Sequence, residues 1–586
     1  MEEKRKIVDL SKTFLYLYFM LEQNLIKMYE QSFRSNREMS AVTDYFTGET
    51  YSYYGFAKEI AKLHIMFDEA GIKPKDKISL VGRNTPRWCV VYIATITYGA
   101  VIVPILQDFT PNDIQHIVNH SESRLLFLTD SYWDGLDEDA MPNVEAVMSL
   151  TDYHVLFERG GDKMTKCIDQ MTENYRKRYP RGFTSDDIKY ADVPNDQLIL
   201  LNYTSGTTGY SKGVMLTVNN LTANVAYIST ISDHSAVPYF HKGGRTLSFL
   251  PLAHAFGCAV DFLTPLAVGG HITLLGRIPA PKILLGAMQK VQPEVICAVP
   301  MLLEKIYRKQ IMPLLEKGPL SIAMKLPLVN EVVFAQIKKK LLDSFGNNLR
   351  ILVLGGAPMN KETELFLQKI HFPFTVGYGM TECGPLISVT PDAREFKATS
   401  CGMYLKDYLD VRIDSNDPMN IAGEILIRGE NVMQGYYKNE KATADAIDAD
   451  GWLHTGDMGT VDLDGTLYIR GRCKTMILTG SGQNIYPEEI EDKLNNMPLV
   501  LESLVLESDG KLYGLVVPDF ETCEREGIDK AALEQTMQEN LKLLNSQIAA
   551  YERLVSISIY PSEFEKTPKK SIKRYLYNDV AKLGLK

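Results

Sequence analysis

The chain has 586 residues, a length that predicts two to four domains and a sizeable buried core. Hydrophobic residues make up 45% and charged residues 23%, which excludes disordered, collagen-like and disulfide-stapled proteins. The 73 Asp and Glu residues outnumber the 63 Lys and Arg residues, and the net charge of −10 gives no broad attraction for nucleic acid or an anionic membrane.

The cysteines and the apolar segments indicate where such a chain resides. Eight cysteines are scattered without a CxxC pair, as is typical of reduced thiols in the cytoplasm. Glu22 and Gln23 follow the N-terminal apolar run where a secretory signal has small residues, so we expect no such signal. Nineteen uncharged residues from Trp88 to Leu106 approach the length of a membrane span. Gly99 divides them into a helix-like and a β-branched half, which predicts a buried helix and strand. We expect a cytoplasmic protein with at most peripheral membrane contact.

Short apolar segments alternate with helical stretches as far as about residue 470. This alternation is typical of an α/β architecture, in which helices cover both faces of a mostly parallel sheet. The predicted strands are Lys77–Val81, Leu125–Leu128, Leu198–Leu201 and Ile351–Leu354.

The pattern changes close to residue 460. Asp464-Gly465 between two alternating segments predicts a two-residue β-hairpin. Pro487, followed by two glutamates, predicts the start of a helix, because Pro suits the first helical position and acids favour the positive end of the helix dipole. We therefore predict a large N-terminal domain over residues 1–473 and a small α+β domain over residues 474–586.

The most informative segment is a loop rich in Thr, Ser and Gly that directly follows the apolar strand ending near Asn202. Glycines let the backbone approach an anion, hydroxyls donate to phosphate oxygens, and Lys212 adds a positive charge. Gly213 follows the lysine, whereas the common nucleoside-triphosphatase loop requires Ser or Thr there. We predict a polyphosphate site made of Thr204, Ser205, Gly206, Thr207, Thr208, Gly209 and Lys212.

With this loop the sequence resembles the adenylate-forming superfamily, which includes acyl-CoA synthetases, luciferases and the adenylation domains of peptide synthetases. Tyr210-Ser211 stands where the family usually has Pro, a departure that leaves the phosphate donors intact. Two further strands end in glycine-rich turns, at Leu354 and Val376, and ligands of open α/β sheets bind at such carboxyl ends. The resemblance implies that these turns are walls of an ATP site.

The resemblance also implies roles for single residues around ATP. Gly356 and Ala357 would line the adenine pocket, and Tyr378, beside Gly379, would stack on the base. Thr381 would contact the α-phosphate, and Glu382 would hold Mg²⁺, a hard cation that prefers carboxylate and phosphate oxygens. The residues implied for the ribose are Asp457 and Arg472.

Other positions concern the acyl group and the second half-reaction. The resemblance makes Lys474 the hinge about which the small domain turns, and places Gly480 and Gly482 at a thiol tunnel. The segment 250–276 would line the acyl pocket. Amino-acid adenylating relatives carry an Asp near this place, and none precedes Asp261, which favours a carboxylate with an apolar tail. His254 is either a gate near the thiol tunnel or a structural histidine.

The sequence departs from the family near its C-terminus. The family carries there a Lys that stabilises the transition state of adenylation. Alignment of Thr567, Ile572 and Arg574 with the family places Ser571 at that position. Three interpretations are open: Lys570 replaces the missing lysine after a one-residue shift, adenylation is slow, or the protein has lost this half-reaction.

Taken together, the resemblance implies an acyl-CoA synthetase similar to bacterial long-chain fatty acid–CoA ligases. Such an enzyme uses ATP and Mg²⁺ to convert a medium- or long-chain fatty acid to acyl-AMP, then transfers the acyl group to coenzyme A. Two alternatives are transfer to the phosphopantetheine of an acyl carrier protein and a non-catalytic protein that binds nucleotide or acyl groups. The second rests on Ser571 alone.

Overall fold

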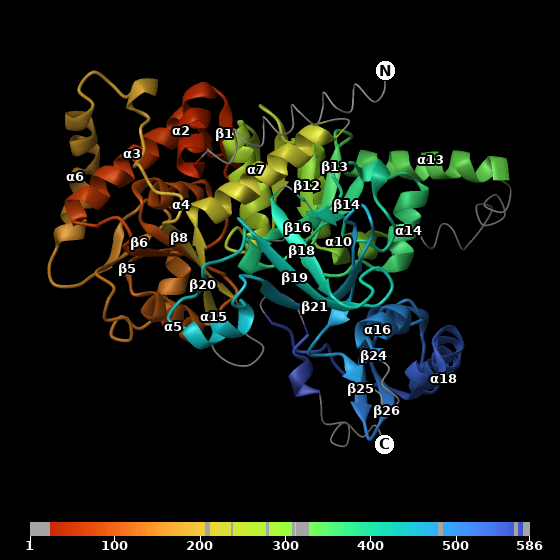
Figure 1. Cartoon of the computed structure of the whole chain (residues 1–586). Helices are drawn as coiled ribbons and strands as arrows, with labels where there is room; N and C mark the ends of the chain where they lie inside the picture. Colours follow the sequence, from red (N-terminus) through yellow and green to blue (C-terminus); the bar gives the residue numbers. More distant parts are fainter. Residues whose placement is uncertain are drawn as a thin grey trace.

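Two large β-sheets with flanking helices form most of the chain in a computed structural model of the protein (Figure 1). Figure 1 shows α7 (Val218–His234) lying between these two sheets. The structure describes residues 24–204, 211–235, 238–276, 280–307, 311, 327–404, 406, 408–478, 484–567 and 572–577.

The first sheet has eight strands, and its central strands are parallel, as predicted for the N-terminal domain. Antiparallel strands complete both edges. The strand order is β20 (Gly435–Tyr436), β9 (Lys212–Thr217), β8 (Leu198–Thr204), β4 (Val101–Ile105), β3 (Lys77–Val81), β5 (Ser123–Leu128), β6 (Ala146–Ser149) and β7 (Val155–Glu158).

The second sheet has seven strands, of which six are parallel and the last is antiparallel. A short three-stranded sheet follows it in the chain. The order in the large sheet is β14 (Phe374–Val376), β13 (Ile351–Leu354), β12 (Val295–Ala298), β10 (Arg245–Ser248), β11 (His271–Leu274), β1 (Ser40–Asp44) and β2 (Thr50–Ser52), and the small sheet contains β15 (Tyr378–Gly379), β16 (Leu386–Val389) and β17 (Met403–Tyr404).

Helices cover these sheets, and the four predicted strands all exist as β3, β5, β8 and β13. A π-helix, η3 (Gly257–Leu263), precedes α8 in the segment predicted to line the acyl pocket. The other described helices of this part are α2 (Leu25–Ser35), α3 (Tyr53–Ala70), α4 (Pro86–Tyr98), α5 (Pro111–Ser121), α6 (Lys163–Arg178), α8 (Thr264–Val268), α9 (Pro281–Val291), α10 (Pro300–Ile306), α13 (Pro327–Ser344), α14 (Lys361–Lys369) and α15 (Glu440–Ala446).

The uncharged segment from Trp88 is a buried helix and strand, as predicted. The side chain of Thr85 caps the first turn of α4 by accepting from the backbone N–H of Trp88 at 3.1 Å. Gly99 ends the helix with φ of +86°, which suits a residue without a Cβ, and β4 begins two residues later. No helix in the described ranges is long and apolar enough to cross a membrane.

A four-stranded antiparallel sheet follows, made of β18 (Leu409–Asp414), β19 (Gly423–Gly429), β21 (Leu453–Val461) and β22 (Leu467–Arg472). The hairpin predicted at Asp464-Gly465 joins β21 to β22, but its turn differs from the two-residue prediction. Gly465 N–H donates to Asp462 O, and Asp462 N–H donates to Thr466 O, so the loop has three residues. Gly465 takes a φ of +94° at the third position, the geometry of a turn closed by a glycine bulge.

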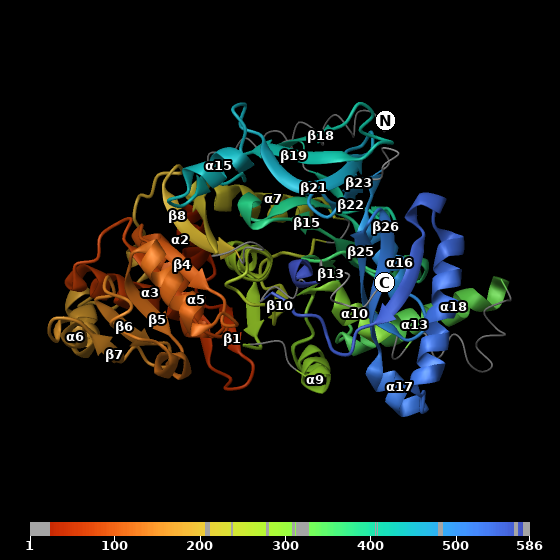
Figure 2. The same ribbon diagram turned by 90° about the horizontal axis from the view of Figure 1, so that it is seen from below.

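Residues beyond β22 build a second core. It contains β25 (Val500–Ser508), β26 (Lys511–Pro518), β27 (Leu554–Ile559), α16 (Pro487–Asn495), α17 (Phe520–Glu526) and α18 (Lys530–Gln547), with β23 (Ile477–Leu478) and β24 (Asn484–Ile485) before them. Figure 2 shows these elements at the opposite end of the molecule from α3 and α6. The helix predicted at Pro487 is α16, and the domain boundary at 473/474 stays a prediction.

An aromatic cluster holds α4 against η3. The ring centroids of Trp88 and Tyr92 lie 6.0 Å and 5.5 Å from that of Phe262, and all three side chains are fully buried. Edge-to-face contacts of this kind add to the burial of aromatic surface. The segment predicted to line the acyl pocket is therefore fixed to the eight-stranded half of the molecule.

We expect Phe262→Ala to lower the free energy of unfolding by about 3–5 kcal/mol, because it removes a fully buried ring and leaves a cavity. Chemical denaturation followed by fluorescence would measure the change. Leu463→Ala is the control, since Leu463 is 85% exposed. A loss no larger than that of the control would contradict the packing described.

Candidate active site

The hairpin of β8 and β9 carries the predicted phosphate loop. Thr204 and Lys212 are direct partners in the antiparallel register, so the loop leaves and re-enters the sheet at one place. A Cβ on Gly213 would come within 3.0 Å of the Tyr203 ring, a tight contact that glycine avoids. Ser205, Gly206, Thr207, Thr208 and Gly209 lie outside the described residues.

Tyr436 connects Lys212 to Glu382. The Nζ of Lys212 lies 4.7 Å from the centre of the Tyr436 ring, a cation–π contact, and the Tyr436 hydroxyl donates to Oε1 of Glu382 at 2.8 Å. Tyr436 takes this position because β20 pairs with β9, placing it opposite Val214. The two predicted charged groups of the phosphate site thus share one aromatic side chain.

Glu382 follows Thr381 in a turn that other elements hold in place. The Asn224 side chain, from α7, donates to Cys383 O at 3.0 Å and accepts from Leu386 N–H at 2.9 Å. Thr381 is buried, and Met433 N–H donates to Glu382 O at 2.8 Å. A Cβ at Gly379 would collide with the carbonyl oxygen of Pro385, so this position requires glycine.

Tyr378, Asp457 and Arg472 form a second constellation. The Tyr378 hydroxyl donates to Oδ2 of Asp457 at 2.7 Å, and Nε of Arg472 lies 2.9 Å from Oδ1 of the same carboxylate. Burial raises the pKa of Asp457, and the Arg472 guanidinium opposes that rise. The arginine side chain is mostly exposed while the carboxylate is buried, so the charged pair faces outward.

The turn after β13 forms a third wall. Gly356 has a φ of +80°, and Gly356 and Ala357 are exposed at the carboxyl end of the strand. The Phe256 ring packs on Gly355, where a Cβ would come within 3.3 Å of it. His254 is half-buried at the start of the same segment, where its Nδ1 accepts from Phe256 N–H at 3.3 Å. The segment predicted to line the acyl pocket therefore contacts the turn predicted to line the adenine pocket, through Phe256.

Asp261 is a buried acid in this segment. Its side chain is fully buried on η3, and neither carboxylate oxygen meets hydrogen-bond geometry with any described residue. Ser248 and Cys297 lie beside it on adjacent strands and oppose the effect of burial, which still raises the pKa of Asp261 to about 7. A group of this kind strains the native state whenever it is charged.

The remaining predicted positions are only partly described. Lys474 is exposed in a turn after β22, where Thr475 N–H and Met476 N–H both donate to Arg472 O. Gly480, Gly482, Lys570 and Ser571 lie outside the described residues. Their roles stay predictions.

A magnesium ion fits the residues that are described. No three His, Cys, Asp or Glu side chains gather into a metal cluster within the described ranges. Mg²⁺ is commonly bound by one or two carboxylates together with the phosphates of its nucleotide. Glu382, held by Tyr436 beside Lys212, would be such a carboxylate.

Sequence reasoning did not identify Tyr436, Asn224 or Phe256. Tyr436 and Asn224 act across sequence separations that no local pattern reveals, and Phe256 was read only as part of an apolar run. Asp261 carried a signal, an acid inside a mostly apolar segment, but the sequence did not show that its oxygens lie outside hydrogen-bond geometry with the described residues.

The two large sheets, with predicted site residues directly after the carboxyl ends of β8, β13 and β14, define the fold of adenylate-forming enzymes. The ATP-bound MatB from Rhodopseudomonas palustris has a TM-score of 0.74 at 21% identity, with 96% of this chain and all of that chain covered. O-succinylbenzoate coenzyme A synthetase from Bacillus subtilis, in complex with AMP, has a TM-score of 0.70 at 19% identity, with 95% and 98% covered.

Family models and sequence relatives make the assignment specific. The model of the AMP-binding enzyme matches residues 29–437, and that of the AMP-binding enzyme C-terminal domain matches residues 474–580. The chain belongs to the AMP-binding enzyme family, within the adenylate-forming acyl-CoA synthetase superfamily.

Curated relatives cover most of the chain. The 4-coumarate–CoA ligase CCL1 of Humulus lupulus is 27% identical over 90% of this chain and 88% of its own length. Long-chain-fatty-acid–CoA ligase FadD15 of Mycobacterium tuberculosis is 28% identical over 82% and 77%, and human long-chain-fatty-acid–CoA ligase 1 is 28% identical over 86% and 77%. These relatives differ in the acid that their names specify.

We expect the stability of the protein to fall as pH rises from about 4 to about 7, partly because of Asp261. Its pKa is about 7 in the folded chain and near 3.9 when unfolded, so the folded state binds this proton more tightly and stabilisation from it is lost across that interval. Asp261→Asn should gain about 1–3 kcal/mol relative to the unmodified protein at pH 8 and little at pH 4.

Urea unfolding at pH 4, 6 and 8 would measure this effect. The control is Asp169→Asn, an exposed aspartate on α6. Equal shifts for both variants at every pH would show that Asp261 is not a strained buried acid.

Proposed function

We propose that this protein is an AMP-forming fatty acid–CoA ligase. The observation that carries the proposal is the constellation of Tyr378, Asp457 and Arg472 near the Lys212–Tyr436–Glu382 chain, in a member of the AMP-binding enzyme family. A nucleotide ribose would meet the Asp457 carboxylate, and its phosphates would meet the hairpin of β8 and β9. Relatives named as CoA ligases cover 79–90% of the chain.

In the first half-reaction a carboxylate oxygen of the substrate forms a bond to the α-phosphorus of ATP, and pyrophosphate leaves. Thr204, Lys212 and the loop between them would stabilise the negative charge of the leaving group. Thr381 would orient the α-phosphate, and Lys570 would take the place of the missing catalytic lysine. A Mg²⁺ ion held by Glu382 would supply charge neutralisation on the phosphate oxygens.

In the second half-reaction the sulfur of coenzyme A attacks the acyl carbon of acyl-AMP, and AMP leaves. We propose that the part after residue 473 turns about Lys474 between the two steps and brings Gly480 and Gly482 toward the thiol. Exposed turns absorb such changes in φ and ψ. His254, beside Phe256, would then act as a gate.

Apolar character of the acyl segment supports a fatty acid as substrate. The buried residues of this segment are mainly apolar. Its acid, Asp261, is fully buried, and burial favours the neutral form of the carboxyl group by raising its pKa to about 7. Relatives named for 4-coumarate have similar identity to those named for long-chain fatty acids, so an aromatic acid is the competing substrate. Acyl carrier protein as acceptor is the other alternative.

We expect AMP release that depends on a fatty acid and on coenzyme A. Purified protein would be supplied with ATP, magnesium and, in separate reactions, decanoate, palmitate or 4-coumarate, with coenzyme A, acyl carrier protein or no acceptor. Release with 4-coumarate alone would contradict the substrate proposed, and release with the carrier alone would contradict the acceptor. Absence of AMP in every reaction would contradict ligase activity.

Ser571→Lys separates the interpretations of the C-terminal departure. If Lys570 already serves adenylation, the variant should change the rate of AMP formation less than about tenfold. If the contact is missing, the variant should raise that rate by about 10²- to 10³-fold. Pyrophosphate exchange into ATP, which reports the first half-reaction alone, would measure the difference. A large gain would contradict the role proposed for Lys570.

We expect Glu382→Gln to lower the rate of AMP formation by about 10²-fold and to raise the magnesium concentration needed for half-maximal rate, because an amide is a poorer ligand for Mg²⁺ than a carboxylate. A magnesium titration of the rate would test this. Glu395→Gln, at an exposed position, is the control. An unchanged magnesium dependence would remove Glu382 from the metal site.

A further inference from the structure

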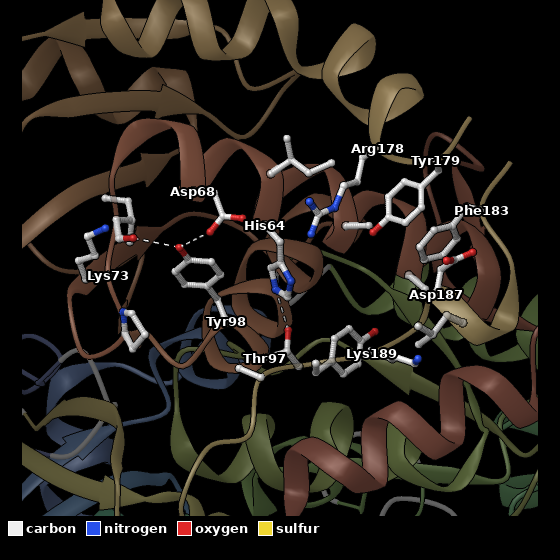
Figure 3. A pocket seen from close by; sticks show the side chains of 18 residues that line it. His64, Asp68, Lys73, Thr97, Tyr98, Arg178, Tyr179, Phe183, Asp187 and Lys189 are labelled. Atoms are coloured by element: carbon white, nitrogen blue, oxygen red, sulfur yellow. Dashed lines mark hydrogen bonds between the residues drawn. The ribbon is translucent and has the colours of Figure 1, made fainter. Parts of the chain in front are cut away.

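A cavity of about 440 Å³ (Figure 3) is lined by residues that include none of those in the candidate active site. It is bounded by α3, α4, the end of α6 and the segment 183–191. Figures 1 and 2 place α3 and α6 at one end of the molecule and the C-terminal elements α16 and α18 at the other. Its volume lies within the range of small-molecule sites.

Aromatic rings line this cavity. They belong to Tyr98, Tyr179, Phe183 and Tyr190, and they surround His64, whose ring centroid lies 5.4 Å from that of Tyr98 and 6.0 Å from that of Tyr190. Aromatic side chains can stack on a planar ligand.

Three cations also line it, and none has an ion-pair partner within the described residues: Lys73, Arg178 and Lys189. Figure 3 shows Arg178 extending from the end of α6 toward His64. The two carboxylates of the lining are already engaged. The Tyr98 hydroxyl donates to Asp68 at 2.7 Å, and Asp187 accepts from the Thr184 backbone and hydroxyl at 2.8 and 2.6 Å.

Two further groups can bond to a ligand without taking on charge. His64 uses Nε2 on Ala94 O and the Thr97 hydroxyl, at 2.9 and 3.1 Å, and burial lowers its pKa to about 4, so it is neutral at physiological pH. The Tyr190 hydroxyl is buried and has no hydrogen-bond partner within the described residues. Such an unsatisfied hydroxyl is unusual in a native structure.

We propose that this cavity is a second binding site, for a planar aromatic ring that carries an anionic group. The anion would bind the Arg178 guanidinium, which matches phosphate and carboxylate with paired donors, and the ring would lie against Tyr98, Tyr179 and Phe183. The Tyr190 hydroxyl would bond to the ligand. A nucleoside monophosphate and an aromatic carboxylate share this chemistry.

The test counts sites rather than activity. Equilibrium dialysis with radiolabelled AMP, and separately with 4-coumarate, would be performed on the full-length protein and on three variants: Arg178→Glu, Arg176→Glu and Tyr190→Phe. Arg176 is the matched control, because it is exposed on the last turn of the same helix but does not line the cavity. Thermal melting would verify that each variant folds.

We expect Arg178→Glu to raise the dissociation constant of one class of sites by about tenfold or more for at least one probe. Arg176→Glu should change that constant less than about twofold. Tyr190→Phe should weaken the same class without lowering the melting temperature, since its hydroxyl makes no bond within the described chain. A purely structural Tyr190 would not alter binding.

The two probes separate the sources of the ligand. Weaker binding of AMP to Arg178→Glu than to the unmodified protein would identify a nucleotide site. Weaker binding of 4-coumarate alone would identify a site for an aromatic acid. Isotherms that are the same for the unmodified protein and Arg178→Glu with both probes would overturn the proposal. The outcome is independent of AMP release, so failure of the proposed function would not affect it.

Discussion

The buried carboxylate of Asp457 is the constraint on which the candidate site depends. It accepts the hydroxyl of Tyr378, from the sheet that follows β14, and pairs with Arg472 on the neighbouring strand β22. Side chains from two separate sheets therefore contact one carboxylate. Removal of either partner would leave that charge buried with less compensation, which would destabilise the fold. Tyr378 and the four-stranded sheet therefore hold each other in position.

A second connection links the eight-stranded sheet to the turn after β15, in the small three-stranded sheet. The Tyr436 side chain lies between Lys212 on β9 and Glu382 in the turn after β15. Asn224 then fixes the same turn from α7, which lies between the large sheets. The groups predicted to contact phosphate are thus oriented by side chains that are not themselves predicted to contact it, as preorganised electrostatic sites require.

Local patterns predicted the strands well but not the contacts between distant segments. The limits of β3 and β13 were read from apolar runs between turn residues, because a buried parallel strand needs such a run. The hairpin at Gly465 was found, but its loop has three residues instead of the predicted two, since Asp-Gly fits more than one turn geometry. Asp457 and Arg472 were foreseen by resemblance, whereas Tyr436 depends on a pairing across more than 200 residues. The cavity beside His64 had no sequence signal, because aromatic and basic residues are common on helices.

The late arrival of β20 has a consequence for synthesis on the ribosome. Strand β9, which carries Lys212, has β20 as its outer partner, and β20 is made only when residues 435 and 436 are translated. Until then the nascent chain exposes an unpaired β edge next to the glycine-rich loop, and such edges invite pairing with other chains. Strand β1 waits in the same way for β11, made about 230 residues later. Chaperone dependence during translation should therefore be concentrated before residue 436 emerges.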